Sequence, residues 1–176
     1  MNNLIYALKE LGFLSDSDTK NLFSISSFKE RLFFQKLVFL LNELTDELGD
    51  YSYNWYLRGP YSPRVSDDLY NIRDIIRSDN THISHFLEDL DLNEDLFLGI
   101  EDIKKLRGVF REEFGHDWTA NDLEILASLV FIEKHTSLKD KGQEEIIKEF
   151  KNRKPNLKNR PLDSYYLVLK KINLIG

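Results

Sequence analysis

The sequence predicts a mainly α-helical protein with one small β-hairpin, and three observations lead to this expectation. Apolar residues recur with helical periodicity along most of the chain. Capping boxes mark two helix starts, at Ser27 with Glu30 and at Thr119 with Asp122. One stretch, residues 51–58, alternates with period two and is rich in aromatic residues, which is typical of a strand.

We expect a single compact domain, since 176 residues is the length of one ordinary domain. Residues 1–153 are predicted to form a helical domain with the hairpin at its core, and residues 28–77 are its most distinctive unit. The segment 154–176 begins as a linker, PNLKNRP, and continues as a helix or strand that docks on the same domain. Helices on both sides of a strand and turn predict a winged-helix-like α+β core.

The clearest helix signals precede the hairpin. Residues 2–12 carry an apolar stripe that closes at Gly12. The capping box at Ser27 opens a long helix that we expect to continue to about Leu48, with Gly49 placed to end it. The middle of this helix is apolar nearly all round, so it is expected to be central in the fold.

The predicted strand leads into a corner and a new helix. Gly59-Pro60 is predicted to turn the chain. Ser62 can then cap a helix that has Pro63 at its first position, where a missing N–H group costs nothing. The strand face expected to pack on the core carries Tyr51, Tyr53, Trp55 and Leu57.

More helices are expected in the second half of the chain. A short one is predicted around residues 83–90, and a longer one runs from Asn93 to about Gly115. Thr119 starts a helix that is apolar nearly all round, and residues 142–154 form a short amphipathic one.

Composition excludes several classes of protein. The chain has no cysteine, so disulfides, thiolate zinc sites and cysteine nucleophiles are ruled out. No apolar run reaches the roughly 18 to 20 residues that span a bilayer. The first residues lack the basic start of a secretory signal. We therefore expect a soluble, cytoplasmic protein with no membrane partner.

Charge is unevenly distributed along the chain. The net charge of −6 weakens any prediction of broad binding to a phosphate backbone. Residues 88–102 contain seven acids and no lysine or arginine, whereas residues 148–171 contain eight bases and two acids. Opposite poles of this kind can steer a partner or a second copy of the chain, and two solvated faces are the simpler alternative.

The sequence contains no recognisable catalytic constellation. It lacks a glycine-rich phosphate loop, a G-x-S-x-G elbow and an H-E-x-x-H motif. His82 and His85 lie one helical turn apart with Asp89 four residues beyond, but a zinc site also needs a further ligand and an open position. We predict no catalytic residue, no metal and no cofactor, and keep a metal-dependent hydrolase as an alternative.

A more distinctive signal is RLFFQKLVFLL followed by YNWYLRGPYSPRVSDDL. An apolar helix with a Q-K-L core, an aromatic strand ending in Gly-Pro and a new helix together resemble the SocA-like Panacea domain family. The stretch, about residues 28–77, is similar also to the small YwgA-like proteins of bacteria and archaea. The resemblance implies a mostly α fold with a small hairpin and an antitoxin that binds and neutralises a toxin without an active site. Arg58 departs from the pattern, which usually has an aromatic residue before Gly-Pro.

We therefore predict a non-enzymatic protein-binding module, antitoxin-like or associated with defence or mobile elements. Its partner would be a toxin, a nuclease or a second copy of the chain. Aromatic and arginine side chains near a turn are typical of interface hot spots. The predicted contact residues are Tyr56, Arg58, Tyr61 and Arg64.

The alternative is a winged-helix transcription regulator with Arg58 and Arg64 at the tip of its wing. Its remaining positive charge would come from the basic C-terminal segment, which contacts either nucleic acid or protein. The residues assigned to those contacts are Lys151, Arg153, Lys154, Lys158 and Arg160.

Overall fold

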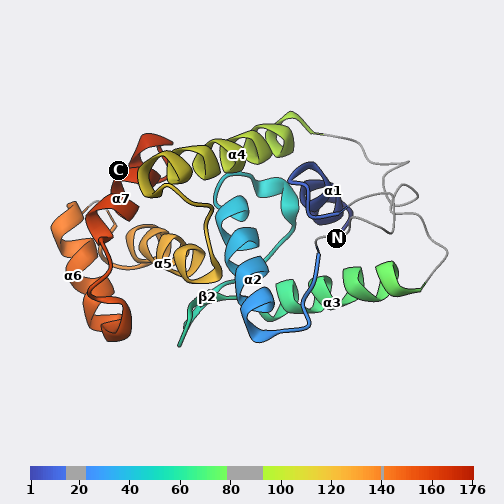
Figure 1. Cartoon of the computed structure of the whole chain (residues 1–176), viewed down its shortest axis with the longest axis horizontal. Coiled ribbons are helices and arrows are strands. Elements are labelled where there is room, and N and C mark those ends of the chain that lie inside the picture. Colours follow the sequence, from blue (N-terminus) through green and yellow to red (C-terminus); the bar gives the residue numbers. More distant parts are fainter. Residues whose placement is uncertain (15–22, 79–92, 140) are drawn as a thin grey trace.

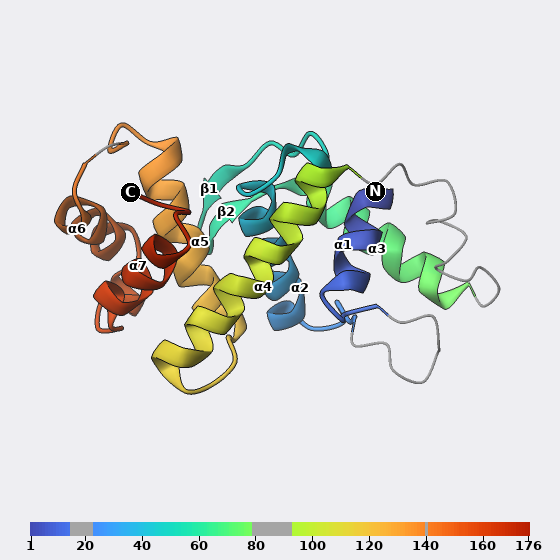
Figure 2. The ribbon, with the colours of Figure 1, turned by 90° about the horizontal axis from the view of Figure 1, so that it is seen from above.

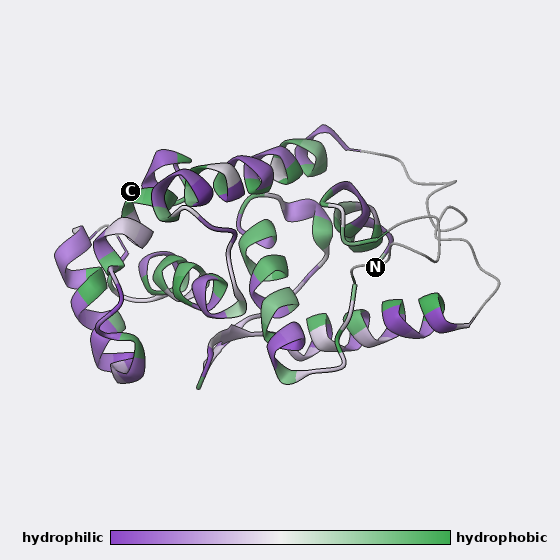
Figure 3. Cartoon of the chain, in the orientation of Figure 1, coloured by the Kyte–Doolittle hydropathy of each residue, from purple (hydrophilic) through white to green (hydrophobic). Residues whose placement is uncertain are grey.

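Two buried helices, α2 (Phe28–Asn42) and α5 (Ala120–His135), pack against each other at the centre of the computed structural model (Figure 1). The structure describes residues 1–14, 23–78, 93–139 and 141–176. Figure 3 shows α5 and the middle of α2 coloured mainly as hydrophobic. The expectation that the helix after Ser27 is central is confirmed, and both predicted capping boxes are present.

The other helices surround this pair. Figure 2 shows α6 and α7 at one end of the molecule and α1 and α3 at the other, with α4 running across α2. The surrounding helices are α1 (Asn2–Glu10), α3 (Pro63–Arg77), α4 (Glu94–Phe114), α6 (Gln143–Arg153) and α7 (Leu162–Lys171). The described chain is thus mainly helical with one two-stranded sheet, in a compact single domain, which confirms the predicted fold class.

The predicted limits of α4 are confirmed. The Asn93 side chain caps its start by accepting a hydrogen bond from the Asp95 amide, and Gly115 ends it in the left-handed conformation, with φ +73°. The short helix predicted around residues 83–90 lies outside the described residues. None of the described helices is long and apolar enough to cross a membrane.

Helix α2 ends earlier than expected, at Asn42 rather than near Leu48. Thr45 adopts an extended conformation and its hydroxyl donates to Asp95 at 2.7 Å, which ties the chain to the first turn of α4. A one-turn 3₁₀ helix, η2 (Asp46–Leu48), follows before Gly49. Packing against α4 therefore overrides a helical pattern that continued through this segment.

The hairpin is formed by β1 (Asn54–Tyr56) and β2 (Gly59–Tyr61), with Tyr56 opposite Gly59. The predicted turn at Gly59-Pro60 is wrong, because Leu57 and Arg58 form the turn and Gly59 starts the second strand. Gly59 has φ +81°, and a Cβ atom there would collide with Ser128 Oγ on α5. Leu57 is 88% exposed, so its predicted place on the core-facing side is also wrong.

The C-terminal segment, predicted as a helix or strand, forms a helix. A short 3₁₀ helix, η4 (Pro155–Leu157), leads into α7, which packs against α4 and α5. The Tyr165 hydroxyl donates to Asp122 Oδ1 at 2.5 Å, and Arg160 donates to the same oxygen at 2.7 Å. This network joins the end of the chain to the first turn of α5.

Candidate functional site

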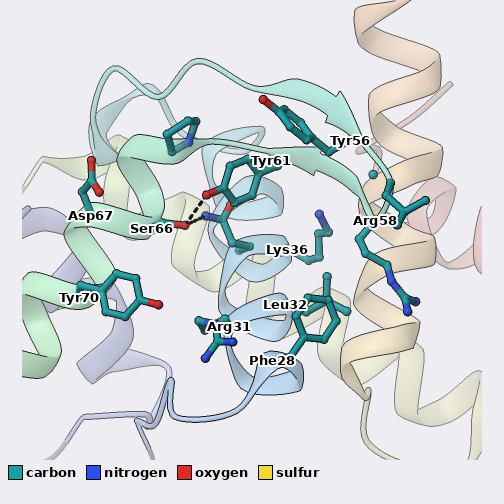
Figure 4. A pocket seen from close by; sticks show the side chains of 14 residues that line it. Phe28, Arg31, Leu32, Lys36, Tyr56, Arg58, Tyr61, Ser66, Asp67 and Tyr70 are labelled. Atoms are coloured by element: carbon teal, nitrogen blue, oxygen red, sulfur yellow. Dashed lines mark hydrogen bonds between the residues drawn. The ribbon is translucent and has the colours of Figure 1, made fainter.

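A groove of about 780 Å³ opens between the start of α2, the hairpin and the start of α3 (Figure 4). Its described lining residues all lie between residues 28 and 70, within the unit at residues 28–77. Most of the lining is apolar or aromatic. The main residues of this kind are Phe28, Leu32, Tyr56, Leu57, Tyr61 and Tyr70.

Gln35 joins α2 to the chain that leaves the hairpin. Its Nε2 donates to the Ser62 carbonyl at 2.9 Å and to Ser66 Oγ at 2.7 Å, and its Oε1 accepts from the Ser62 amide at 3.3 Å. Ser66 Oγ in turn donates to the Tyr61 hydroxyl at 3.1 Å (Figure 4). Ser62 does precede α3, but its own hydroxyl makes no hydrogen bond, so the predicted side-chain cap is wrong.

Lys36 makes a second link from α2 to the hairpin. Its side chain is buried, with 1% of the residue exposed, and its ammonium donates to the Pro60 carbonyl oxygen. Burial lowers the pKa of Lys36 to about 7, because an ammonium loses hydration there, and the nearby Lys154 lowers it further. Glu124 acts in the opposite direction but forms no ion pair with Lys36.

Lys154, just after α6, holds the hairpin from the opposite side. Its ammonium donates to the Leu57 carbonyl at 2.9 Å and to Glu124 Oε1 at 2.6 Å. Burial lowers the pKa of Lys154, and the hydrogen bond and charge of Glu124 oppose that shift. The other oxygen of Glu124 lies 3.3 Å from Arg58 Nη1. Glu124 therefore forms ion pairs with Lys154 and Arg58 but not with Lys36.

The rim of the groove exposes large apolar side chains. Leu57 is 88% exposed, Tyr56 55% and Phe28 54%. The Tyr56 and Tyr61 rings meet edge to face with centroids 5.2 Å apart, and the Arg58 guanidinium lies 5.8 Å from the centre of the Phe28 ring. Apolar side chains gathered on one exposed rim are typical of interaction sites on soluble proteins.

Three of the four predicted contact residues meet at this groove. Tyr56, Arg58 and Tyr61 all line it, whereas Arg64 does not. Arg64 instead donates to the Asp50 carbonyl at 2.9 Å. The groove also has lining residues outside the hairpin that the sequence did not single out as contacts of a protein partner, among them Phe28, Leu32 and Tyr70. A lysine within the apolar middle of α2 was a further signal, since Lys36 also lines the groove.

The basic C-terminal residues are largely held by contacts within the chain. Lys154 is 1% exposed, so its assignment to an external contact is wrong. The Arg153 guanidinium lies 4.9 Å from the Trp55 ring centre, and Arg160 is held by Asp122. Arg153 and Arg160 are nevertheless exposed, as are Lys151 and Lys158.

Among the described residues, no group of three or more histidine, aspartate or glutamate side chains is placed to hold a metal ion. The candidate ligands His82, His85 and Asp89 lie outside the described ranges. Comparisons of the chain with protein-family models, with curated proteins and with solved structures returned no match.

Proposed function

We propose that this protein is a non-enzymatic binding module that holds a protein partner at the groove between α2, the hairpin and α3. An antitoxin-like or defence-associated role, with a toxin or nuclease as partner, agrees with the resemblance to the Panacea domain family. Within the motifs that carry that resemblance, Lys36 donates to the Pro60 carbonyl of the hairpin, and Gln35 donates to the Ser62 carbonyl just after it.

The observation that carries the proposal is the exposed apolar rim above a rigidly built groove. Hydrogen bonds from Gln35, Lys36 and Lys154 hold the hairpin on both sides, so the tip presents Tyr56 and Leu57 in a fixed position. A surface that is ordered before binding loses little conformational entropy when a partner docks. Aromatic side chains and arginine, the residue types present here, dominate interface hot spots.

The contacts of the basic residues weigh against the transcription-regulator alternative. The centre of α2 is buried against α5, so this helix cannot enter a DNA groove. Arg58 pairs with Glu124, and Arg64 is held by the Asp50 carbonyl. If duplex DNA nevertheless binds, its affinity should fall steeply with salt, which a salt titration measures.

Site-specific photo-crosslinking tests the proposal. The whole protein, with a photoreactive amino acid in place of Leu57, is expressed in the organism from which it comes. After irradiation, the crosslinked products are identified by mass spectrometry. We expect one protein to be captured from position 57. The matched control is Leu98, which is 53% exposed on α4, a helix that lies on the other side of α2 from β2 (Figure 1). Identical products from both positions, or none from position 57, would contradict the proposal.

A further inference from the structure

We propose that the groove recognises a short segment of its protein partner in which an apolar side chain stands next to a carboxylate, and that this carboxylate pairs with Lys36. The inference rests on the proposed function and adds the chemistry of the partner. It combines two features of the site, a buried cation that pairs with no carboxylate of the described residues and an aromatic lining.

The first feature is the charge balance beneath the hairpin. Lys36, Lys154 and Arg58 bring three positive charges to this region, and Glu124 is the carboxylate that pairs with two of them. Lys36 has three N–H donors and uses one of them on the Pro60 carbonyl. A buried ammonium is costly unless it is paired, so a carboxylate that enters the groove would be strongly favoured there.

Two further charged side chains line the groove. Arg31, one turn before Lys36, donates from Nη1 to the carbonyls of Ile25 and Ser26, each at 3.1 Å, and adds positive charge. Asp67 on α3 is the one acidic residue of the lining. The groove thus has an excess of cations although the chain has a net charge of −6. Charge complementarity selects an acidic segment and disfavours a basic one.

The second feature is the aromatic and aliphatic lining. Phe28, Leu32, Tyr61 and Tyr70 surround a volume of about 780 Å³, within the range that encloses a large apolar group. Leu57 lines the groove at its edge, yet 88% of the residue is exposed at the tip of the hairpin. A ligand confined to the groove would leave most of Leu57 uncovered, whereas a polypeptide that continues past the rim would cover it. This favours a protein segment as the occupant.

A second copy of the chain is an alternative occupant of the groove, because it too exposes apolar side chains close to acids. Phe97 and Leu98 are 52% and 53% exposed near the start of α4, and the acids Glu94 and Glu101 lie on the same helix. Sedimentation velocity of the whole protein separates this case from the proposal. The proposal predicts a monomer at tens of micromolar. An oligomer that dissociates when Leu98 is replaced by Lys would indicate that a second copy occupies the groove. That result would overturn the proposal.

The deciding experiment selects a random twelve-residue peptide library, displayed on phage, against the whole protein. We expect the selected peptides to be enriched in a large apolar residue next to Asp or Glu and depleted in Lys and Arg. In the tightest peptide, replacing the acid by its amide should weaken binding at least tenfold, measured by fluorescence anisotropy. This change leaves the protein itself untouched, so its folding is not in question.

Matched protein variants then locate the carboxylate. Lys36→Met should weaken binding about as much as the amide peptide does, and the two changes together should cost little more than either alone. Lys29→Met removes an exposed lysine from the same helix and should leave affinity within twofold. An equal loss of peptide affinity in Lys36→Met and Lys29→Met would reflect the change in net charge alone. That result would overturn the assignment of the carboxylate to Lys36.

Failure of this inference is distinguishable from failure of the proposed function. Selected peptides without acidic enrichment, or no selected peptide at all, would overturn the inference, while capture of a protein from position 57 would still support the binding role. Acidic peptides whose binding is indifferent to Lys36→Met would also overturn it.

Discussion

Lys36 and Lys154 form a natural comparison within this molecule. Each is 1% exposed, and each donates to a carbonyl of the hairpin, Lys36 to Pro60 and Lys154 to Leu57. They differ in their charged neighbours. Lys154 has the Glu124 carboxylate at 2.6 Å, whereas Lys36 has no carboxylate of the described chain at ion-pair distance. The same residue type at the same depth is electrostatically satisfied on one side of the hairpin and unsatisfied on the other.

The packing of the hairpin also differs between the side that faces α5 and the side that faces α2. On the α5 side, Gly59 lies so close to Ser128 that a Cβ atom has no room. On the α2 side, the hairpin leaves the groove open. A buried charge with its partner inside the chain holds the fold together, whereas one that lacks a partner beside an open groove marks a place for a ligand.

Glu124→Gln should have the largest effect on stability. The substitution leaves Lys154 buried without an anion, and breaking a buried pair from one side typically costs 3–5 kcal/mol, so we expect a loss of about 3 kcal/mol in the free energy of unfolding. Urea denaturation of this variant and of Glu145→Gln, an exposed acid on α6, provides the measurement and its control. Equal stability of the two variants would show that the Glu124 pair does not hold the hairpin.

Gly59→Ala should destabilise the protein by about 2 kcal/mol, since a non-glycine residue at positive φ is strained and its Cβ meets Ser128 Oγ. Ser128→Ala alone should be nearly neutral, because that hydroxyl is buried without a hydrogen-bond partner. The double variant should recover part of the loss, as the nearest atom of residue 128 would then lie 3.7 Å away. Strictly additive losses would place the strain elsewhere.

Lys36→Met should change how stability depends on pH. The folded-state pKa of Lys36, about 7, lies below its usual 10.5, so between these values the unfolded chain binds a proton that the folded chain does not. Stability therefore rises with pH in this window, and for Lys36 the gain from pH 7 to pH 9 is about 2 kcal/mol. The variant should lose this gain, while Lys29→Met keeps it.

Chemical denaturation at several pH values measures this effect. The lowered pKa of Lys154 also makes stability rise with pH. The free energy of unfolding of Lys36→Met should therefore rise less steeply with pH than that of the wild type, but it should still rise. The interpretation would be wrong if wild type and Lys36→Met showed parallel curves. Besides burial, the charges that act on the pKa of Lys36 are Lys154 after α6, which lowers it, and Glu124 on α5, which raises it. Arg31, Arg58 and Asp67 are the other charged side chains that line the same groove.

Leu57→Asn should have the smallest effect on stability and a large one on binding. An exposed turn residue contributes little to folding, so the free energy of unfolding should change by no more than about 0.5 kcal/mol. Affinity for a selected peptide should fall at least tenfold, because Leu57 forms the apolar rim. Unchanged affinity would show that the rim takes no part in recognition.

Sequence reasoning predicted the parts of the fold that local signals control. The capping boxes at Ser27 and Thr119 and the glycine at 115 gave helix limits that the structure confirms, because caps act through neighbouring residues. The early end of α2 was not predictable in this way. It depends on Thr45 contacting Asp95, fifty residues further along the chain.

The candidate site was predictable only in part, for the same reason. Tyr56, Arg58 and Tyr61 were selected as residue types that favour interfaces, and they do meet at one groove. The hairpin turn was misplaced by two residues because Gly-Pro is a common turn signal, and the contact of Gly59 with α5 is invisible in sequence. That Lys154 is buried and paired, and that Lys36 is buried without a carboxylate, emerges only when α2, α5 and α6 are assembled.

The most direct test of the account is the titration of Lys36 itself. NMR of the protein with ¹³C-labelled lysine, assigned by comparison with Lys36→Met, reports the pKa of its ammonium with and without a saturating selected peptide. The account predicts a pKa near 7 in the free protein and a clear rise when the peptide carboxylate binds. An ordinary lysine pKa in the free protein, or no change on binding, would contradict it.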